Sequence, residues 1–316
     1  MSLNWSSAQA DTDWVTVLWH NDLFVGTDGG GYTNGAYISW YDLSSDNRED
    51  FRAPLVTRPF LGWLIEEHGD DFEVSAHTVG QAMVTPKDIS KPVPDPNDAP
   101  YAGLLFFRSG FVTLSGNRAD SLSVTLGMVG PSSGADESQR LIHKMTGSTK
   151  PQGWDYQIKD EPVGQVERAR VWRWGPAPTE EPHADLLLLG NASLGNLESA
   201  LGGALIARFG TRLERSFGTA NQLTGRISNP MAIDGGWNVY LGVGADYVYN
   251  QIFVSGSGIR SGQKGELRHD QYATYAGWSY SWDRLSLTCS LVANTNLDKN
   301  ASARQRFGSV TLAWRL

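Results

Sequence analysis

Alternation of apolar and polar residues runs through most of the chain and predicts β-strands. In the clearest stretch, residues 237 to 249, Trp237, Val239 and the odd-numbered residues that follow them are apolar or aromatic. The even-numbered residues between them include small and polar ones such as Gly242 and Asp246. A period of two puts these sets on opposite faces of a strand. An apolar face with aromatic residues at both ends is typical of a strand that crosses a bilayer.

Eleven further segments share this pattern, so the sequence predicts an all-β chain of about twelve strands. These segments are 14–19, 32–43, 72–83, 101–114, 121–129, 163–174, 184–194, 201–213, 267–282, 285–296 and 305–316. Single-chain bacterial outer-membrane barrels have an even number of antiparallel strands. We therefore expect one transmembrane β-barrel domain over residues 14–316, preceded by an N-terminal tail, residues 1–13, that includes an expression scar.

Composition narrows the class of protein further. The 316 residues include 35 glycines and 12 tryptophans, which suits a β-protein with tight turns and aromatic girdles. A net charge of −8 argues against a nucleic-acid partner. Cys289 is the only cysteine, so an internal disulfide is excluded. No run of about 18 apolar residues predicts a transmembrane helix, but barrel strands expose only every second residue to lipid.

One short helix is predicted between the strands, and it carries the strongest candidate for chemistry. After Gly130-Pro131, residues 134–137 are small and then acidic, as at a helix N-terminus. Gln139 and His143 are four residues apart and would share one face of this helix. An imidazole is a natural general base near neutral pH, and an adjacent amide can orient it or a water. We expect His143 to be the base of a lipid-hydrolysing enzyme; the alternative is an ordinary surface histidine.

Other polar residues near strand ends are further candidates. Asn21 and Asp22 close the first strand and offer hard oxygen ligands for calcium, although they could also form a simple turn. A bound calcium ion would polarise an ester carbonyl and stabilise the oxyanion. Thr33 could donate a hydrogen bond to that oxyanion. Tyr32 and Lys87 are candidates for binding the substrate, Lys87 through lipid phosphates, or else are ordinary strand-start and loop residues.

Barrel topology predicts that these candidates lie at one rim. With both termini on the periplasmic side, odd-numbered strands run outward and even-numbered strands run back. Residues 20–22, residues 32–35, residues 100–103 and the helix with His143 then all lie at the rim that faces the cell exterior.

At these residues the chain resembles the outer-membrane lipid A 3-O-deacylase family. The resemblance covers roughly residues 14 to 160, and the second half is similar only in its barrel pattern. The matching motifs are Asn21-Asp22-x-Phe24, Thr27-Asp28-x-x-x-Tyr32-Thr33-Asn34-Gly35, Gly80-Gln81-x-Met83-x-Thr85-Pro86-x-Asp88-Ile89, Pro100-Tyr101-Ala102-Gly103, Gly130-Pro131, Gln139-x-x-x-His143, Gly147 and Trp154-x-x-Gln157.

This resemblance implies a twelve-stranded barrel that removes the 3′-linked acyloxyacyl group from lipid A in the outer leaflet and depends on calcium. The histidine that activates water in the family matches His143, and its glutamine one turn earlier matches Gln139. Its paired Asn-Asp near the metal matches Asn21 and Asp22, and its hydroxyl residue at the rim matches Thr33. The expected partners are lipopolysaccharide and outer-membrane lipids, and a small barrel of this kind can work as a monomer.

Three alternatives stay open from the sequence. A serine or threonine nucleophile could pair with His143, as in the outer-membrane phospholipase. A non-enzymatic barrel or passive pore would need an open, charged lumen, whereas the inward faces here are mostly small and polar. A soluble ligand-binding β-protein would have to expose apolar stripes to water, which promotes aggregation.

Overall fold

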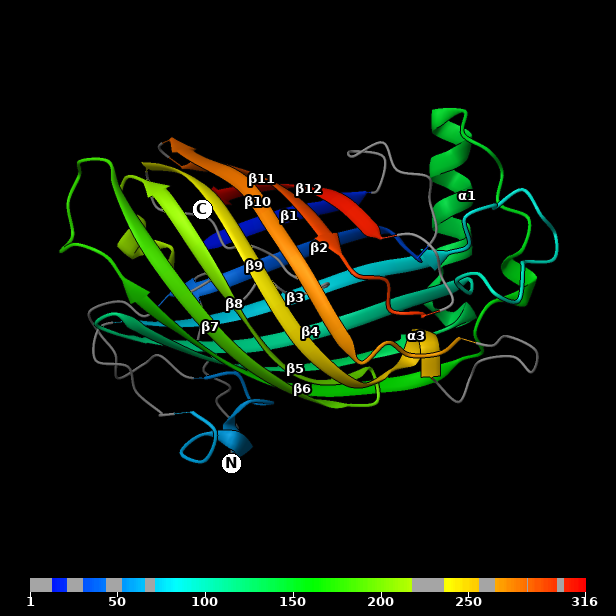
Figure 1. Ribbon diagram of the computed structural model, residues 1–316, viewed down its shortest axis with the longest axis horizontal. Helices are drawn as coiled ribbons and strands as arrows, with labels where there is room; N and C mark the ends of the chain where they lie inside the picture. The colour runs from blue at the N-terminus through cyan, green and yellow to red at the C-terminus, as the bar shows by residue number, and fades with distance from the viewer. Residues whose placement is uncertain are drawn as a thin grey trace, which may run out of the picture.

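The computed structural model describes residues 13–21, 31–43, 53–65, 72–217, 236–255, 265–282, 284–299 and 304–316. In this part of the chain, twelve antiparallel strands close into a barrel, in which each strand pairs with its sequence neighbours and β1 pairs with β12 (Figure 1). The prediction of an all-β, twelve-stranded barrel is confirmed. The strands are β1 (Trp14–Asn21), β2 (Gly31–Leu43), β3 (Phe72–Thr85), β4 (Ala102–Ser115), β5 (Arg118–Val129), β6 (Glu161–Trp174), β7 (His183–Gly195), β8 (Glu198–Gly210), β9 (Gly236–Gln251), β10 (Asp270–Trp282), β11 (Leu285–Asn294) and β12 (Gln305–Arg315).

The predicted helix is present as α1 (Ala135–Thr146). Gly134 before it and Gly147 after it both have positive φ, a conformation that glycine adopts without steric cost. In Figure 1, α1 lies at the right-hand end of the barrel with its axis across the strand direction, whereas the C-terminus lies toward the other end. In the described part of the chain, the short helices are α3 (Ile252–Ser255) and four 3₁₀ turns: η3 (Arg58–Phe60), η4 (Pro131–Ser133), η5 (Trp154–Tyr156) and η6 (Leu213–Arg215). No helix among the described residues is long and apolar enough to cross a membrane.

The outer face of the barrel is apolar, as the alternation predicted. In β9, the outward-facing Leu241 and Val243 are 66% and 55% exposed, whereas the adjacent inward-facing Tyr240 is buried. Exposed aromatic side chains lie near both ends of the strands. Those toward the α1 end include Tyr247, Tyr249 and Tyr272, and those toward the opposite end include Trp172, Trp174, Phe209, Tyr280 and Trp282. This belt and its two aromatic girdles match the hydrocarbon core and interfaces of a bilayer.

Side chains fill much of the barrel interior. Toward the α1 end, one buried apolar cluster includes Leu104, Phe106, Phe253 and Phe307. A second cluster lies nearer the opposite end and includes Leu187, Leu189, Ile206, Tyr240 and Tyr275. This packing agrees with the filled interior that the small and polar inward positions indicated.

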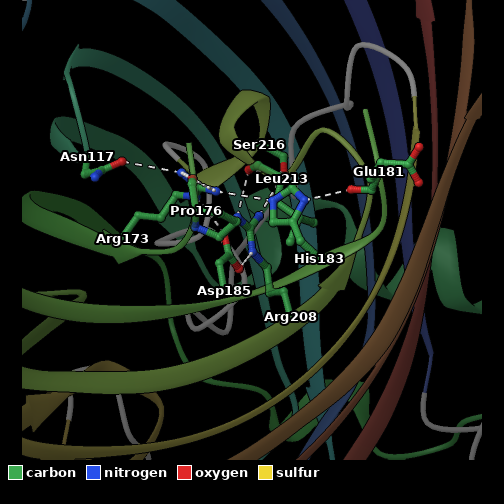
Figure 2. Close-up of polar contacts among 9 residues, drawn as sticks. All are labelled: Asn117, Arg173, Pro176, Glu181, His183, Asp185, Arg208, Leu213 and Ser216. Atoms are coloured by element: carbon green, nitrogen blue, oxygen red, sulfur yellow. Dashed lines mark hydrogen bonds and ion pairs between the residues drawn. The ribbon is translucent and has the colours of Figure 1, made fainter. Parts of the chain in front are cut away.

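A buried ion network lies inside the barrel at the end opposite α1 (Figure 2). The carboxylate of Asp185 accepts hydrogen bonds from Arg173 Nε at 2.7 Å and from Arg208 Nε at 2.9 Å. Arg208 also donates to the Leu213 carbonyl and to the Ser216 hydroxyl, both at 2.8 Å. These bonds fasten the η6 turn to the inner wall. Breaking a buried ion pair typically costs about 3–5 kcal/mol, so the network fixes this end of the lumen.

One segment packs against the outside of the wall. In Figure 1, residues 53–65, coloured blue, include a short coil that lies outside the barrel below β6. Phe111 of β4 and Leu122 of β5 point away from the lumen, yet they are 1% and 0% exposed. Ile65 forms a buried cluster with them, which shows that this segment covers part of the apolar wall.

We predict that an arginine on the outer face destabilises the barrel according to its depth. Val243→Arg places a charge midway along β9 and should lower the free energy of unfolding in lipid vesicles by about 2–4 kcal/mol. Tyr249→Arg, near the end of the same strand, should cost only about 0–1 kcal/mol. Denaturant titration of the two variants in the same vesicles measures both values. Equal losses would contradict the assignment of this face to the bilayer.

Candidate active site at one rim of the barrel

The strand register brings candidate residues from separate motifs into one row. Asn21 pairs with Asn34, Asn34 pairs with Met83, and Met83 pairs with Gly103. The exposure of neighbouring alternate positions, such as Trp19, puts this row on the outer face of the wall. The row lies at the end of the barrel where α1 is found. The predicted clustering of these strand ends and the helix at one rim is therefore confirmed.

Gly103 is the point where α1 meets the barrel wall. A Cβ added to Gly103 would overlap the Ser133 hydroxyl and the Ala135 side chain, so only glycine allows this close approach. The Gly103 carbonyl accepts a hydrogen bond from Gly130 N at 2.9 Å. From β3, Gln81 Nε2 donates to the Ser133 carbonyl at 2.7 Å. These contacts attach the start of α1 to the outside of β3 and β4.

A small apolar core outside the wall supports the helix. It contains Met83, Tyr101, Ala135 and Trp154, and Ile89 packs against it. The rings of Tyr101 and Trp154 are 4.9 Å apart between centroids. Burial raises the pKa of Tyr101 to about 12, so its hydroxyl stays protonated and donates to the Ile89 carbonyl at 3.3 Å. The Pro100–Gly103 motif thus has a structural role that the sequence did not reveal.

Gln139 is buried beneath α1 and is held by a tryptophan. Trp154 Nε1 donates to Gln139 Oε1 at 2.7 Å, and both side chains are at least 97% buried. In this bond the carbonyl oxygen of the Gln139 amide is the acceptor, so the Nε2 group is left to donate to other acceptors. Among the described residues, Gln139 makes no hydrogen bond to His143. Sequence reasoning did not assign Trp154 a function, and only its place in the Trp-x-x-Gln motif pointed to it.

His143 is half-buried in the last turn of α1, and the chain that follows orients its ring. After the left-handed Gly147, Ser148 N donates to the His143 carbonyl at 3.0 Å. The turn places the Thr149 carbonyl 2.6 Å from His143 Nδ1. A carbonyl can only accept, so Nδ1 carries the hydrogen of this bond. In the neutral imidazole, Nε2 then holds the lone pair that a general base needs.

The structure describes only some of the remaining candidate residues near the first two strands. Asp22 lies outside the described residues, and the side chains of Tyr32 and Thr33 are also outside the description. The backbone of β2 has a register shift between Tyr32 and Asn34, so Thr33 is the extra residue of a β-bulge. Bulges are frequent at barrel rims and next to active sites, where they redirect a side chain. Asn21 is 6% exposed at the end of β1.

Lys87 lies in the loop between β3 and β4, next to a solvent-open cavity of about 360 Å³. The cavity is lined by Pro86, Lys87, Asp88, Lys91, Asp95 and Asp98. Lys87 N donates to Asp98 at 2.9 Å, and Lys91 forms an exposed ion pair with Asp88 at 3.7 Å. The described residues contain no group of three or more His, Cys, Asp or Glu side chains that could hold a metal.

A closed antiparallel barrel with an even strand number, an apolar outer belt and two aromatic girdles defines the class of outer-membrane β-barrel proteins. Within this class, the family model described as outer membrane protein LpxR matches residues 1–316. The chain belongs to this family and is a protein of the outer membrane. A search of curated proteins finds no match.

One of the similar solved structures shows the same fold. LpxR from Salmonella typhimurium superimposes with a TM-score of 0.79 at 16% sequence identity, over 96% of this chain and 100% of that one. The β domain of the Bordetella autotransporter BrkA gives a TM-score of 0.45 at 10% identity, over 96% and 98% of the two chains. The translocator domain of NalP from Neisseria meningitidis gives 0.38 at 10% identity, over 98% and 90%.

We predict that Gly103→Ala loosens α1 without unfolding the barrel, because the new methyl group overlaps Ser133 and Ala135. Hydrogen–deuterium exchange should then speed up in residues 135–146, while β3 and β4 stay protected. Gly110→Ala is the matched control on the same strand, since its Cβ would find its nearest neighbours at 3.6 Å. Unchanged exchange of α1 in Gly103→Ala would contradict the proposed contact.

Proposed function

We propose that this protein removes the 3′-linked acyloxyacyl group from lipid A, with α1 and His143 at the cell exterior. Two points support the proposal: membership of the LpxR family and the resemblance of the rim motifs to lipid A 3-O-deacylases. The observation that carries the chemistry is the hydrogen bond from His143 Nδ1 to the Thr149 carbonyl. It selects the tautomer in which Nε2 can accept a proton.

In the proposed reaction, His143 Nε2 takes a proton from a water molecule, and the water oxygen attacks the ester carbonyl carbon. The carbonyl oxygen becomes an oxyanion in a tetrahedral intermediate. When this intermediate collapses, the bond to the sugar oxygen breaks and His143 returns its proton to that oxygen. The products are the acyloxyacyl chain as a free carboxylic acid and the sugar hydroxyl, so one ester and one water are consumed.

Distances along the wall are compatible with one site that contains both Asn21 and His143. Three strand spacings separate Asn21 from Gly103, or about 14 Å across the sheet. From Ala135, which packs on Gly103, α1 extends about 12 Å to His143. The helix is therefore long enough to span this separation, and its axis lies across the strand direction in Figure 1.

The donor set near β1 fits calcium. Asn21 and Asp22 offer an amide oxygen and a carboxylate, and calcium prefers several oxygen ligands that include backbone carbonyls and water. When bound, calcium would polarise the ester carbonyl and stabilise its oxyanion.

The other candidates would act on the substrate. Thr33, at the β-bulge of β2, would donate to the oxyanion, and the neighbouring Tyr32 would contact the lipid A backbone. Gln139 Nε2 is the free end of a fixed amide and would hold the attacking water. Lys87, beside its open cavity, would bind a phosphate of lipid A, because an ammonium group pairs with phosphate as a point charge.

We predict that His143→Ala lowers the rate of lipid A deacylation by about 10²–10⁴, the usual contribution of a general base. Mass spectrometry of lipid A after incubation with the purified barrel measures the rate. Glu137→Ala, an exposed position in the first turn of α1, serves as the control and should keep the wild-type rate. A fully active His143→Ala protein would overturn the proposed role.

The mechanism with a serine nucleophile makes a different prediction. The described serines around the start of α1 have hydroxyls that donate elsewhere: Ser132 to Asp160, Ser133 to Gly130 O and Ser138 to Gly134 O. We therefore expect a fluorophosphonate probe to leave the protein unlabelled, and a calcium chelator to abolish deacylation. Covalent labelling that is lost in His143→Ala, with full activity in chelator, would establish the serine or threonine mechanism instead.

A further inference from the structure

Arginine side chains gather on the outer face of the wall, at the end of the barrel opposite α1. Arg168 and Arg170 lie on the outward positions of β6, as do the exposed Trp172 and Trp174. Both arginines bind one carboxylate of β5, Asp120, whose side chain is only 4% exposed. A third guanidinium, that of Arg118, also contacts this carboxylate, at 3.1 Å.

Arg168 and Arg170 differ in how their nitrogen atoms are used. Arg168 donates to the Leu64 carbonyl at 2.6 Å, to the Ala169 carbonyl and to Asp120, so its guanidinium is fully engaged by the protein. Arg170 donates only through Nε, to Asp120 at 2.6 Å. Neither of its terminal nitrogens hydrogen-bonds to a described residue, and its side chain is 36% exposed.

The cluster has an excess of positive charge. Among the described residues, Asp120 is the only carboxylate paired with Arg168 or Arg170, so these two cations share one anion. A charge that faces lipid is costly near the bilayer centre and tolerable where the headgroups supply a counter-ion. The two terminal nitrogens of Arg170 present the fork that binds phosphate in a bidentate manner.

The position along the strand matches the headgroup region. Trp172 belongs to the aromatic girdle at this end. The Arg170 guanidinium lies over its ring, 5.8 Å from the ring centre. The girdle marks the boundary between hydrocarbon and headgroups. The 53–65 segment lies next to the cluster, because its Leu64 carbonyl accepts a hydrogen bond from Arg168. In the same segment, the side chains of Leu55 and Trp63 are 74% and 78% exposed. These apolar side chains suit insertion among acyl chains beside a bound headgroup.

We propose that Arg170, supported by Asp120 and Arg168, binds the phosphate of an anionic phospholipid in the leaflet opposite α1. With α1 at the cell exterior, as proposed above, this is the periplasmic leaflet. The binding itself does not depend on deacylation, so its test remains valid whatever the catalytic activity proves to be. The same guanidinium fork could bind free phosphate, and the experiment below separates the two sources.

Native mass spectrometry of the detergent-solubilised barrel, titrated with phosphatidylglycerol, tests this site. The wild-type protein should retain the lipid with an affinity about tenfold higher than Arg170→Gln, the usual loss for one charge-assisted phosphate contact. Arg170→Lys, which keeps the charge without the fork, should lose less. It also provides the comparison with wild type if Arg170→Gln does not fold, as judged by heat-modifiable gel mobility.

Two controls distinguish lipid binding at Arg170 from a general effect of positive charge and from binding of free phosphate. Arg284→Gln removes the same charge in the exposed β10–β11 turn at the same end and should bind phosphatidylglycerol like the wild type. Millimolar inorganic phosphate should not displace the lipid. Equal binding by the wild type and both Arg170 variants, equal loss in Arg284→Gln, or displacement of the lipid by phosphate alone would each overturn the proposal.

Discussion

Hydrogen-bond closure of the sheet is the constraint on which the rest of this structure depends. In hydrocarbon, every backbone N–H and C=O must find a partner within the protein, so the first and last strands have to pair. The β1–β12 ladder does this over all eight residues of β1. Closure fixes the register of every strand against its neighbours, and that register puts Asn21, Asn34, Met83 and Gly103 in one row at the rim. The geometry of the site is thus a consequence of the barrel.

The outer wall is used for more than contact with lipid. At one end, the start of α1 packs on Gly103, and a small core around Tyr101 and Trp154 holds the helix against the wall. Toward the other end, the 53–65 segment covers Phe111 and Leu122. Each covered patch adjoins polar groups: His143 and the buried Gln139 belong to the helix, and the arginine cluster borders the segment. Elements packed outside the barrel therefore create polar sites that a bare apolar wall could not support.

The proposed chemistry depends on how α1 ends. The left-handed Gly147 turns the chain back, and the Thr149 carbonyl then fixes the hydrogen on His143 Nδ1. Gln139, one turn earlier, is held through Trp154 in the loop that follows the helix. Backbone and loop atoms thus orient both side chains. The partner of His143 Nδ1 is a neutral backbone carbonyl, which sets the tautomer without adding charge.

The sequence by itself determined the strands and their number through period-two alternation, and the helix through its capping residues. The order of the strands along the chain also determined the end of the barrel where the candidate residues gather. All three are local properties of the chain. It did not determine that α1 lies on the outside of the wall, that Gln139 pairs with Trp154, or that Arg168 and Arg170 share Asp120. The last of these contacts joins residues 48 and 50 positions apart, and Arg168 reaches Leu64 across 104 positions. Only the tertiary structure decides such contacts, since they require a particular register between neighbouring strands and a loop folded back on the finished wall.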